Sequence, residues 1–184
     1  MAIPNVTITE AGIMAIKFNI NSQKAIEALL WIIWRGETNI YNLMKILFAA
    51  DKYHLNSYGR PVTGDKYIAM QFGTVPSWIY DATKLTKPGI GFIKNGNSLA
   101  LEPGRNYDPA LLSDSDIEAL EQGFNEYAGK DFESVKRQNH GEKAWLKAVE
   151  RNPGLEASDI LFEDMIEEEW LAEELKETAQ YIAI

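Results

Sequence analysis

Asp51 and His54 are the residues whose types and spacing could most readily carry chemistry. Side chains three positions apart share one face of a helix, so this carboxylate and imidazole could shuttle a proton or supply two ligands to a metal ion. No third ligand can be placed beside them from the sequence, and His140 is the only other histidine. We therefore interpret His54 as a structural histidine held by hydrogen bonds, and we expect no metal ion and no cofactor.

The sequence motifs of the common catalytic classes do not occur in this chain. It has no cysteine, which excludes a thiol nucleophile and a cysteine-based zinc site, and it contains none of the GxSxG, HExxH and GxxxxGK[ST] patterns. We therefore expect a protein that is not an enzyme. An unrecognised enzyme that uses Asp51 and His54 stays open as an alternative.

The net charge of −9 is confined to one segment of the chain. Residues 156–177 hold ten acidic side chains and one lysine, whereas the rest of the 184 residues hold 17 acidic and 17 basic side chains. DNA and lipid surfaces are bound chiefly through clustered cations, so this neutral body argues against both partners. The acidic segment either contacts a basic partner or simply solvates an exposed helix face.

A long helix is predicted over residues 40–58, the segment that contains Asp51 and His54. Thr38 is a suitable cap, glycine and proline follow the helix, and its apolar residues recur at helical spacing: Ile40, Leu43, Met44, Leu47 and Phe48.

Two elements are expected before this helix. Residues 13–20 alternate apolar and polar side chains, which predicts a strand. Ser22 can cap a helix over residues 23–35, where Gly36 ends the pattern. The side chains expected on its buried stripe are Ile26, Leu29, Leu30, Ile33 and Trp34.

Residues 58–77 interrupt the helical pattern with three glycines and two prolines. They predict a helix end, a turn, a strand over residues 66–72, and a new helix over residues 74–85 with Thr74 or Ser77 as its cap. Backbone geometry and a buried strand face are enough to explain six of these residues: Gly59, Pro61, Gly64, Tyr67, Gly73 and Pro76.

Later in the chain, a β-hairpin is predicted over residues 91–101, because Asn95-Gly96 is a favoured two-residue type I′ turn. A pair of helices is expected within residues 131–140 and 141–150.

Two more helices are predicted from their capping residues. Ser115 with Glu118 forms a capping box for a helix that runs to about Tyr127. Ser158 or Asp159 would cap the acidic C-terminal helix. The apolar stripe opposite its glutamates consists of Phe162, Met165, Ile166, Trp170, Leu175 and Ala179.

These elements predict an α+β fold, mostly helical around a small antiparallel sheet that includes the hairpin near residues 91–101. We expect an N-terminal strand-like extension over residues 1–21, one folded domain over residues 22–155, and an acidic amphipathic helix over residues 156–184. No apolar run approaches the ~20 residues that span a bilayer, and no signal-peptide pattern is visible. We therefore expect a cytoplasmic protein.

The sequence FAADKYHLNSYGRPVTGDKYIAMQFGTVPSWIYD, residues 48–81, resembles the Panacea domain, also called the SocA-like antitoxin domain. The pattern ADKxHL…YGRPxTGDxYxAMxxGxVPSxxYD is kept almost throughout, with Thr74 where many members have proline. A looser likeness continues to about Glu150, so the resemblance identifies residues 22–155 as the Panacea domain. Residues 1–21 and the acidic segment lie outside it.

The resemblance implies an antitoxin that neutralises a cognate toxin by direct protein contact, in a toxin–antitoxin or phage-derived system. One branch of the family instead delivers its toxin to the ClpXP protease, so a proteolytic adaptor is the alternative. No catalysis is attributed to the domain. The toxin's identity and the oligomeric state stay open.

We expect the partner surface near residues 58–77, with further contacts from the acidic segment, because basic toxin sites would attract its glutamates. The candidate contact residues are Asp51, Lys52, His54, Tyr58, Arg60, Asp65, Trp78, Tyr80, Glu167, Glu168 and Trp170.

A winged-helix DNA-binding regulator is the alternative of another class. Residues 76–85 would then be its recognition helix and residues 94–97 its wing tip. The charged residues on this helix and just after it are one acid, Asp81, and two lysines, Lys84 and Lys87, and the wing tip has one lysine. This charge pattern argues against DNA as a partner, because DNA-binding faces concentrate many more cations.

Overall fold

The structure is a computed structural model that describes residues 5–8, 14–85 and 89–182. Its helices are α1 (Ser22–Trp34), α2 (Ile40–Tyr58), α3 (Ser77–Ala82), α4 (Asp114–Tyr127), α5 (Phe132–His140), α6 (Lys143–Arg151), α7 (Phe162–Met165) and α8 (Glu169–Ile182). Its strands are β1 (Asn5–Ile8), β2 (Met14–Lys17), β3 (Tyr67–Met70), β4 (Gly73–Pro76), β5 (Phe92–Asn95), β6 (Ser98–Leu101) and β7 (Ala157–Ile160). A 3₁₀ turn spans Pro109–Leu111.

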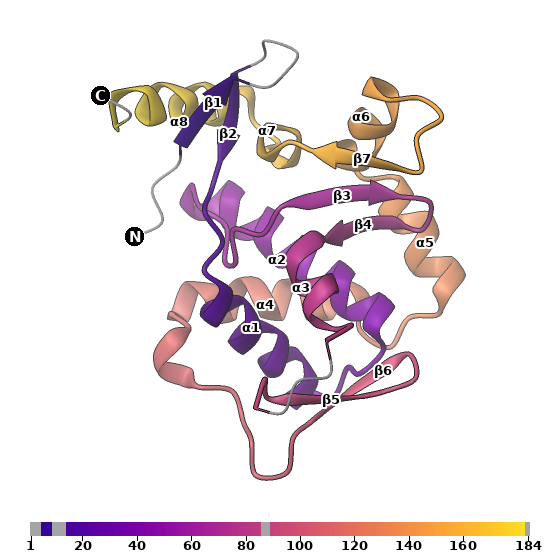
Figure 1. The fold of residues 1–184 in the computed structure, drawn as a ribbon. Coiled ribbons are helices and arrows are strands. Elements are labelled where there is room, and N and C mark those ends of the chain that lie inside the picture. Colours follow the sequence, from indigo (N-terminus) through magenta and orange to yellow (C-terminus); the bar gives the residue numbers. More distant parts are fainter. Residues whose placement is uncertain (1–4, 9–13, 86–88, 183–184) are drawn as a thin grey trace.

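The described strands form three small antiparallel sheets (Figure 1). Strand β3 is central in a three-stranded sheet, with β4 on one side and β7 on the other. β1 pairs with β2, and β5 pairs with β6. The predicted α+β class, mostly helical around small antiparallel sheets, is therefore confirmed.

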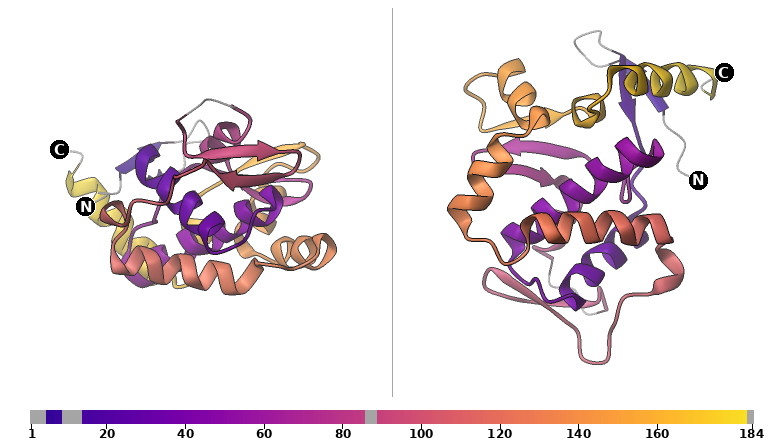
Figure 2. Two further views of the ribbon diagram at one scale, coloured as in Figure 1. Left: turned by 90° about the horizontal axis from the view of Figure 1, so that it is seen from below. Right: turned by 180° about the vertical axis from the view of Figure 1, so that it is seen from behind.

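Helix α2 forms the centre of the hydrophobic core. Its side chains from Asn42 to Asp51 are all buried, and the backbone of α4 passes very close to it. A Cβ added to Gly123 of α4 would lie only 2.4 Å from the carbonyl oxygen of Ile46. Glycine is needed at this crossing because a side chain would force the two helices apart. Figure 2 shows α4 lying along α2 in the view from behind.

The bounds predicted for the long helix are confirmed by α2, but the predicted caps of the first two helices are wrong. Asn21 caps α1 and accepts a hydrogen bond from the backbone N–H of Lys24 at 3.1 Å. Asn39 caps α2 and accepts from the N–H of Tyr41 at 2.9 Å. Ser22 is already the first residue of its helix, which leaves the preceding asparagine in the capping position.

Residues 58–77 contain a hairpin where one strand and the start of a helix were predicted. Gly59 and Gly64 have φ angles of +69° and +70°, as turns of this kind require. The strand is limited to β3, and residues 73–76 return beside it as β4. Thr74 therefore lies in a strand rather than at a helix cap, and α3 begins only at Ser77.

The predicted turn and capping box in residues 91–118 are shifted by one or two positions. Asn95 pairs with Ser98, so Gly96 and Asn97 form the turn. Only Gly96 has a positive φ, at +60°, which fits a type II′ turn rather than type I′. The capping box of α4 consists of Ser113 and Asp116, not Ser115 and Glu118.

The C-terminal segment does not begin with a helix as predicted. Ser158 and Asp159 belong to β7, which pairs with β3, and two helices, α7 and α8, follow it. Buried and exposed residues alternate along β7, a pattern too short to outweigh the capping residues in the sequence. The predicted separation of this segment from the residues before it stays a prediction.

Two tryptophans of the predicted apolar stripes are exposed. Trp34 is 49% exposed in the last turn of α1, and Trp170 is 61% exposed in the first turn of α8. Both stand at a helix end, where helical periodicity no longer determines whether a side chain faces the core. Ala179 lies outside the residues whose side chains are described. No helix of the described chain is long and apolar enough to cross a membrane.

Candidate functional site

A buried carboxylate ties the middle of α2 to the loop that precedes β3. Asp51 is fully buried and accepts hydrogen bonds from the N–H of Thr63 at 2.8 Å and from its hydroxyl at 2.6 Å. The hydroxyl of Tyr67 donates to the same carboxylate at 3.0 Å. All three groups donate hydrogen bonds, so the acceptor oxygens of the carboxylate are satisfied. Burial nevertheless raises the pKa of Asp51 to about 6.

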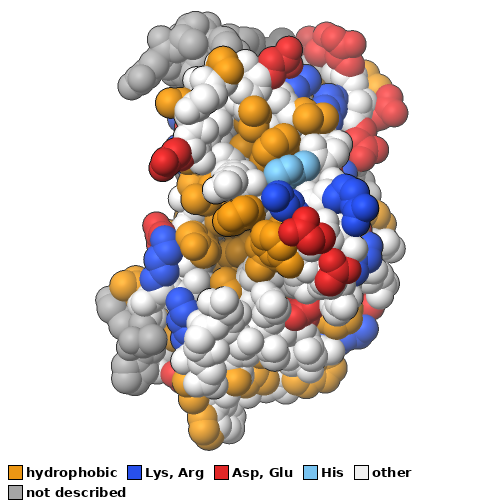
Figure 3. All heavy atoms as spheres, turned by 90° about the vertical axis from the view of Figure 1, so that its right-hand side faces the viewer, with side chains coloured by type: hydrophobic (Ala, Val, Ile, Leu, Met, Phe, Trp, Pro, Cys, Tyr) orange, Lys and Arg blue, Asp and Glu red, His pale blue; other side chains and the backbone are white. Residues whose placement is uncertain are grey.

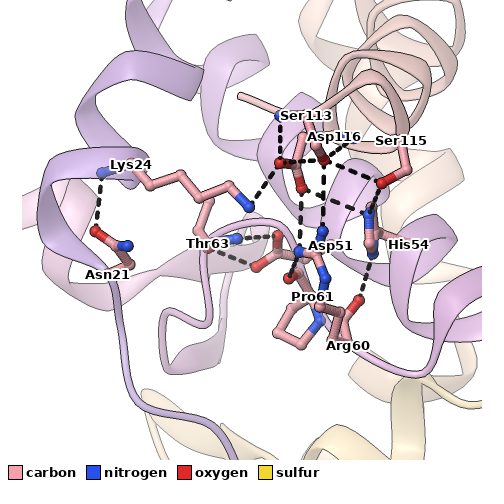
Figure 4. A network of polar contacts seen from close by, with 10 residues as sticks. All are labelled: Asn21, Lys24, Asp51, His54, Arg60, Pro61, Thr63, Ser113, Ser115 and Asp116. Atoms are coloured by element: carbon pink, nitrogen blue, oxygen red, sulfur yellow. Dashed lines mark hydrogen bonds and ion pairs between the residues drawn. The ribbon is translucent and has the colours of Figure 1, made fainter. Parts of the chain in front are cut away.

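His54 lies in a second polar cluster, which joins α2 to the start of α4 (Figure 4). Its Nδ1 lies 2.6 Å from the carbonyl oxygen of Arg60, and its Nε2 lies 3.0 Å from the hydroxyl of Ser115. The carboxylate of Asp116 is 3.4 Å from the same Nε2. Burial lowers the pKa of His54, so the imidazole is neutral at pH 7. The sequence-based interpretation of a structural histidine agrees with these contacts.

Asp116 is the anion that holds this second cluster together. It pairs with Lys24 at 2.7 Å and with Arg60 at 3.1 Å, and it accepts from the N–H of Ser113 at 2.8 Å. Burial alone would raise the pKa of Asp116, but the hydrogen bonds from Lys24 and Ser113 outweigh it and lower the pKa. Lys24 and Arg60 also line a polar hollow of about 620 Å³ beside this cluster. Both cations are already paired with the carboxylate of Asp116.

Asp51 and His54 face different partners, although both lie on α2. Asp51 contacts the loop before β3, and His54 contacts Arg60 and the start of α4. Among the described residues, no group of three histidine, aspartate or glutamate side chains is arranged to hold a metal ion. The contacts of Asp51 therefore hold α2 to the loop before β3, and those of His54 hold α2 to Arg60 and to the start of α4.

Three other predicted contact residues also stabilise the fold. Asp65 accepts hydrogen bonds from the N–H groups of Trp78 and Ile79 at 3.0 and 2.9 Å, so it caps α3 from outside the helix. Lys52 pairs with Glu142 at 2.8 Å, and the hydroxyl of Tyr58 donates to Glu118 at 2.7 Å.

The remaining predicted contact residues are at the surface, in two separate places. Trp78 is 39% exposed on α3, and the nearby Tyr80 is half-buried. Glu167, Glu168 and Trp170 are exposed around the start of α8. The structure therefore does not gather the predicted residues into one site.

A large groove lies beside the turn between β3 and β4, and the sequence did not predict it. It has a volume of about 960 Å³ and lies among α2, this turn, α5, α6 and the loop before β7. We call it the turn groove. Figure 3 shows hydrophobic side chains gathered at the centre of this face.

Two phenylalanines form the exposed wall of the turn groove. Phe72 is 45% exposed and Phe132 is 42% exposed. Their ring centroids lie 5.5 Å apart, and the ring of Phe132 lies 4.8 Å from that of Tyr41. Large apolar side chains that stay in water at a concave surface mark a binding site.

A buried lysine lies beside the floor of the turn groove. Lys45 is 1% exposed, and its ammonium donates to the carbonyl oxygen of Thr74 at 2.6 Å. Its Nζ is also 4.8 Å from the ring centroid of Tyr41. No described carboxylate pairs with it, and burial lowers the pKa of Lys45 to about 7. In the sequence this lysine was visible only as a polar residue among the apolar positions of the long helix.

The comparison with protein families matches residues 43–146 to the family described as "Antitoxin SocA-like, Panacea domain". The match covers more than half of the chain, so the protein belongs to this SocA-like antitoxin family. It contains most of α2, all of β3 and β4 and most of the lining of the turn groove, and it ends before β7. Searches of curated proteins and of solved structures each find no match.

The Asp51 contacts lead to a prediction for Thr63→Val. This substitution keeps the shape but removes the hydroxyl that donates to Asp51, so we expect a loss of about 1–3 kcal/mol in the free energy of unfolding. Because the pKa of Asp51 is about 6, the loss should be larger at pH 8, where the carboxylate is ionised, than at pH 5. Urea unfolding at both pH values measures this, with Thr63→Ser as control. Equal losses at pH 5 and pH 8 would contradict it.

A second prediction concerns the charge of Lys45. The unfolded chain holds this proton to about pH 10, whereas the folded protein releases it near pH 7, so stability should rise with pH between these values. Lys45→Met should therefore be more stable than the natural chain at pH 7, by on the order of 2 kcal/mol. Its advantage should shrink as the pH approaches 10.

Thermal unfolding of the natural chain, Lys45→Met and the control Lys94→Met measures this effect. If Lys45→Met were less stable at pH 7, the ammonium would be favourable to the fold, and the account of an uncompensated buried cation would be wrong.

Proposed function

We propose that this protein is an antitoxin that neutralises a toxin protein by direct contact and occlusion, with the turn groove as its principal contact surface. Family membership supports the antitoxin role in general. The observation that carries the choice of surface is the pair of exposed phenylalanines, Phe72 and Phe132, at the edge of a groove of about 960 Å³. Aromatic side chains in concave, partly apolar surfaces are the usual anchors of protein interfaces.

The family motif has a structural role in this proposal. Asp51 fixes the loop before β3, and Asp65 fixes the start of α3, so the β3–β4 turn projects from a rigid base. A preorganised turn lowers the entropic cost of placing Phe72 on binding. The motif residues therefore position the contact surface and need not touch the toxin themselves.

The acidic residues around α8 are a second candidate contact. Glu167, Glu168 and Trp170 are exposed, and they would suit a toxin with a basic active site. Helix α8 lies at the upper left of Figure 1, whereas the β3–β4 turn, which borders the turn groove, lies on the right-hand side. A toxin that contacts both would have to wrap around the molecule.

DNA binding has less support from the geometry. The helix that would have to read DNA is α3, which is only six residues long, and its first N–H groups are bonded to Asp65. A recognition helix needs its N-terminal residues free to contact base edges.

Co-expression with the product of a neighbouring gene tests the proposal. The toxin alone should stop growth, and the natural chain should restore growth and co-purify with an undiminished amount of toxin. Phe72→Asp should abolish both effects, because it places a charge at the apolar wall. Trp34→Asp is the matched control, since Trp34 is an exposed aromatic residue outside the groove lining.

Two outcomes would contradict this proposal. Rescue by Phe72→Asp that equals rescue by Trp34→Asp would exclude the turn groove as the contact surface. A fall in the amount of toxin that depends on ClpXP would exclude occlusion and support the adaptor alternative.

A further inference from the structure

Four lysines surround the turn groove without a carboxylate partner. Lys45 lies beside its floor, Lys94 and Lys130 line it, and Lys136 lies over its aromatic wall. None of the ion pairs among the described residues includes any of them. Elsewhere in the described chain, Lys24, Lys52, Lys66, Lys84 and Lys147 each have an acidic partner within 4 Å.

The aromatic wall already binds one of these cations. The Nζ of Lys136 lies 5.5 Å from the ring centroid of Phe72 and 6.0 Å from that of Phe132. Cation–π contacts of this kind hold the ammonium at the surface without neutralising its charge. The wall is therefore apolar and positively charged at the same time.

The acidic side chains near the turn groove do not balance these lysines. Asp131 lines the groove, but its carboxylate caps α5 and accepts from the N–H and the hydroxyl of Ser134 at 3.0 and 2.7 Å. Glu156 is exposed on the loop before β7. Glu133 is close enough to contribute to the raised pKa of Tyr41, and it too has no ion pair with a described lysine.

Lys45 is the cation that would gain most from an incoming anion. Its ammonium has given up most of its hydration and has only the carbonyl of Thr74 and the ring of Tyr41 in exchange. A buried charge without a counter-ion is costly, and an anion that reaches it from the groove would recover part of that cost. Lys45 and Tyr41 both line the groove, and the ammonium lies 4.8 Å from the ring centroid of Tyr41.

We propose that the turn groove binds an acidic, apolar segment of the toxin, whose apolar side chains pack on Phe72 and Phe132 and whose carboxylate pairs with Lys45. This inference rests on the proposed antitoxin function and specifies the chemistry of the partner. It differs from the expectation for the acidic segment, because it assigns the positive side of the contact to this protein and the negative side to the toxin.

The contact should depend on pH through the Lys45 ammonium. Besides Thr74, the groups near it are Tyr41 on α2 and His140 and Asn139 on α5. Asn139 in turn contacts the hydroxyl of Tyr127 on α4. Burial lowers the pKa of His140 and raises those of Tyr41 and Tyr127, so these three groups are neutral between pH 7 and 9. Only Lys45 then loses its charge in this range, and binding of a carboxylate should weaken as the pH rises.

Small-molecule probes test the inference without the toxin. We would titrate the full chain with 4-phenylbutyrate and with the neutral 4-phenylbutanamide at pH 6.5 and pH 9, and follow binding by NMR. The carboxylate should bind about tenfold more tightly than the amide at pH 6.5, the value of a charge-assisted hydrogen bond. The preference should largely disappear at pH 9 and in Lys45→Met, and persist in the control Lys66→Met, because Lys66 is an exposed lysine outside the groove lining.

Equal affinity for the carboxylate and the amide, or a preference that survives in Lys45→Met, would overturn the inference. Binding of a second copy of this chain in the groove would also overturn the inference, since α8 is itself acidic and apolar. Such binding would appear as a concentration-dependent dimer that Phe72→Asp abolishes. Sedimentation of the free protein measures this.

The co-expression assay separates this inference from the proposed function. If the natural chain rescues growth and Lys45→Met rescues it as well as Lys66→Met does, the pairing with Lys45 is wrong, and the antitoxin role stands. If the natural chain fails to rescue growth, the proposed function is wrong, and the probe titrations still decide the chemistry of the groove.

Discussion

The path of the chain after α2 depends on the buried carboxylate of Asp51. Its hydrogen bonds to both polar groups of Thr63 and to the hydroxyl of Tyr67 fix the loop that Pro61 and Gly64 turn away from the helix. Thr63 in turn accepts from the N–H of Asp65, whose own carboxylate caps α3. One buried anion thus fixes where the β3–β4 hairpin begins, and with it the wall of the turn groove.

Elements with strong local signals could be predicted from the sequence. The bounds of α2 follow from its apolar periodicity and from Gly59, whose φ of +69° ends the helix. The β5–β6 hairpin follows from Gly96, although its turn type depends on register, which the sequence does not determine. The predicted caps of α1, α2 and α4 were wrong by one or two residues, because several residues that can cap a helix stand close together at these helix starts.

Contacts between distant segments could not be predicted. β7 lies about 90 positions after β3 in the sequence, and only pairing with that edge makes residues 157–160 a strand. The turn groove likewise combines side chains from α2, α5, α6 and the β3–β4 turn, so no local pattern marks it. Asp51 and Asp65 looked like surface candidates because polar residues near turns usually are, but both are buried and join parts of the fold.

In the proposed function, the rigid base formed by the Asp51 and Asp65 contacts presents the turn groove to a toxin. Hydrogen exchange of the free protein and of its toxin complex tests it most directly. The account predicts new protection at residues 70–73 and 130–136, with residues 167–177 little changed. Protection confined to residues 167–177 would contradict it, because the acidic segment would then be the contact surface and the groove would be left empty.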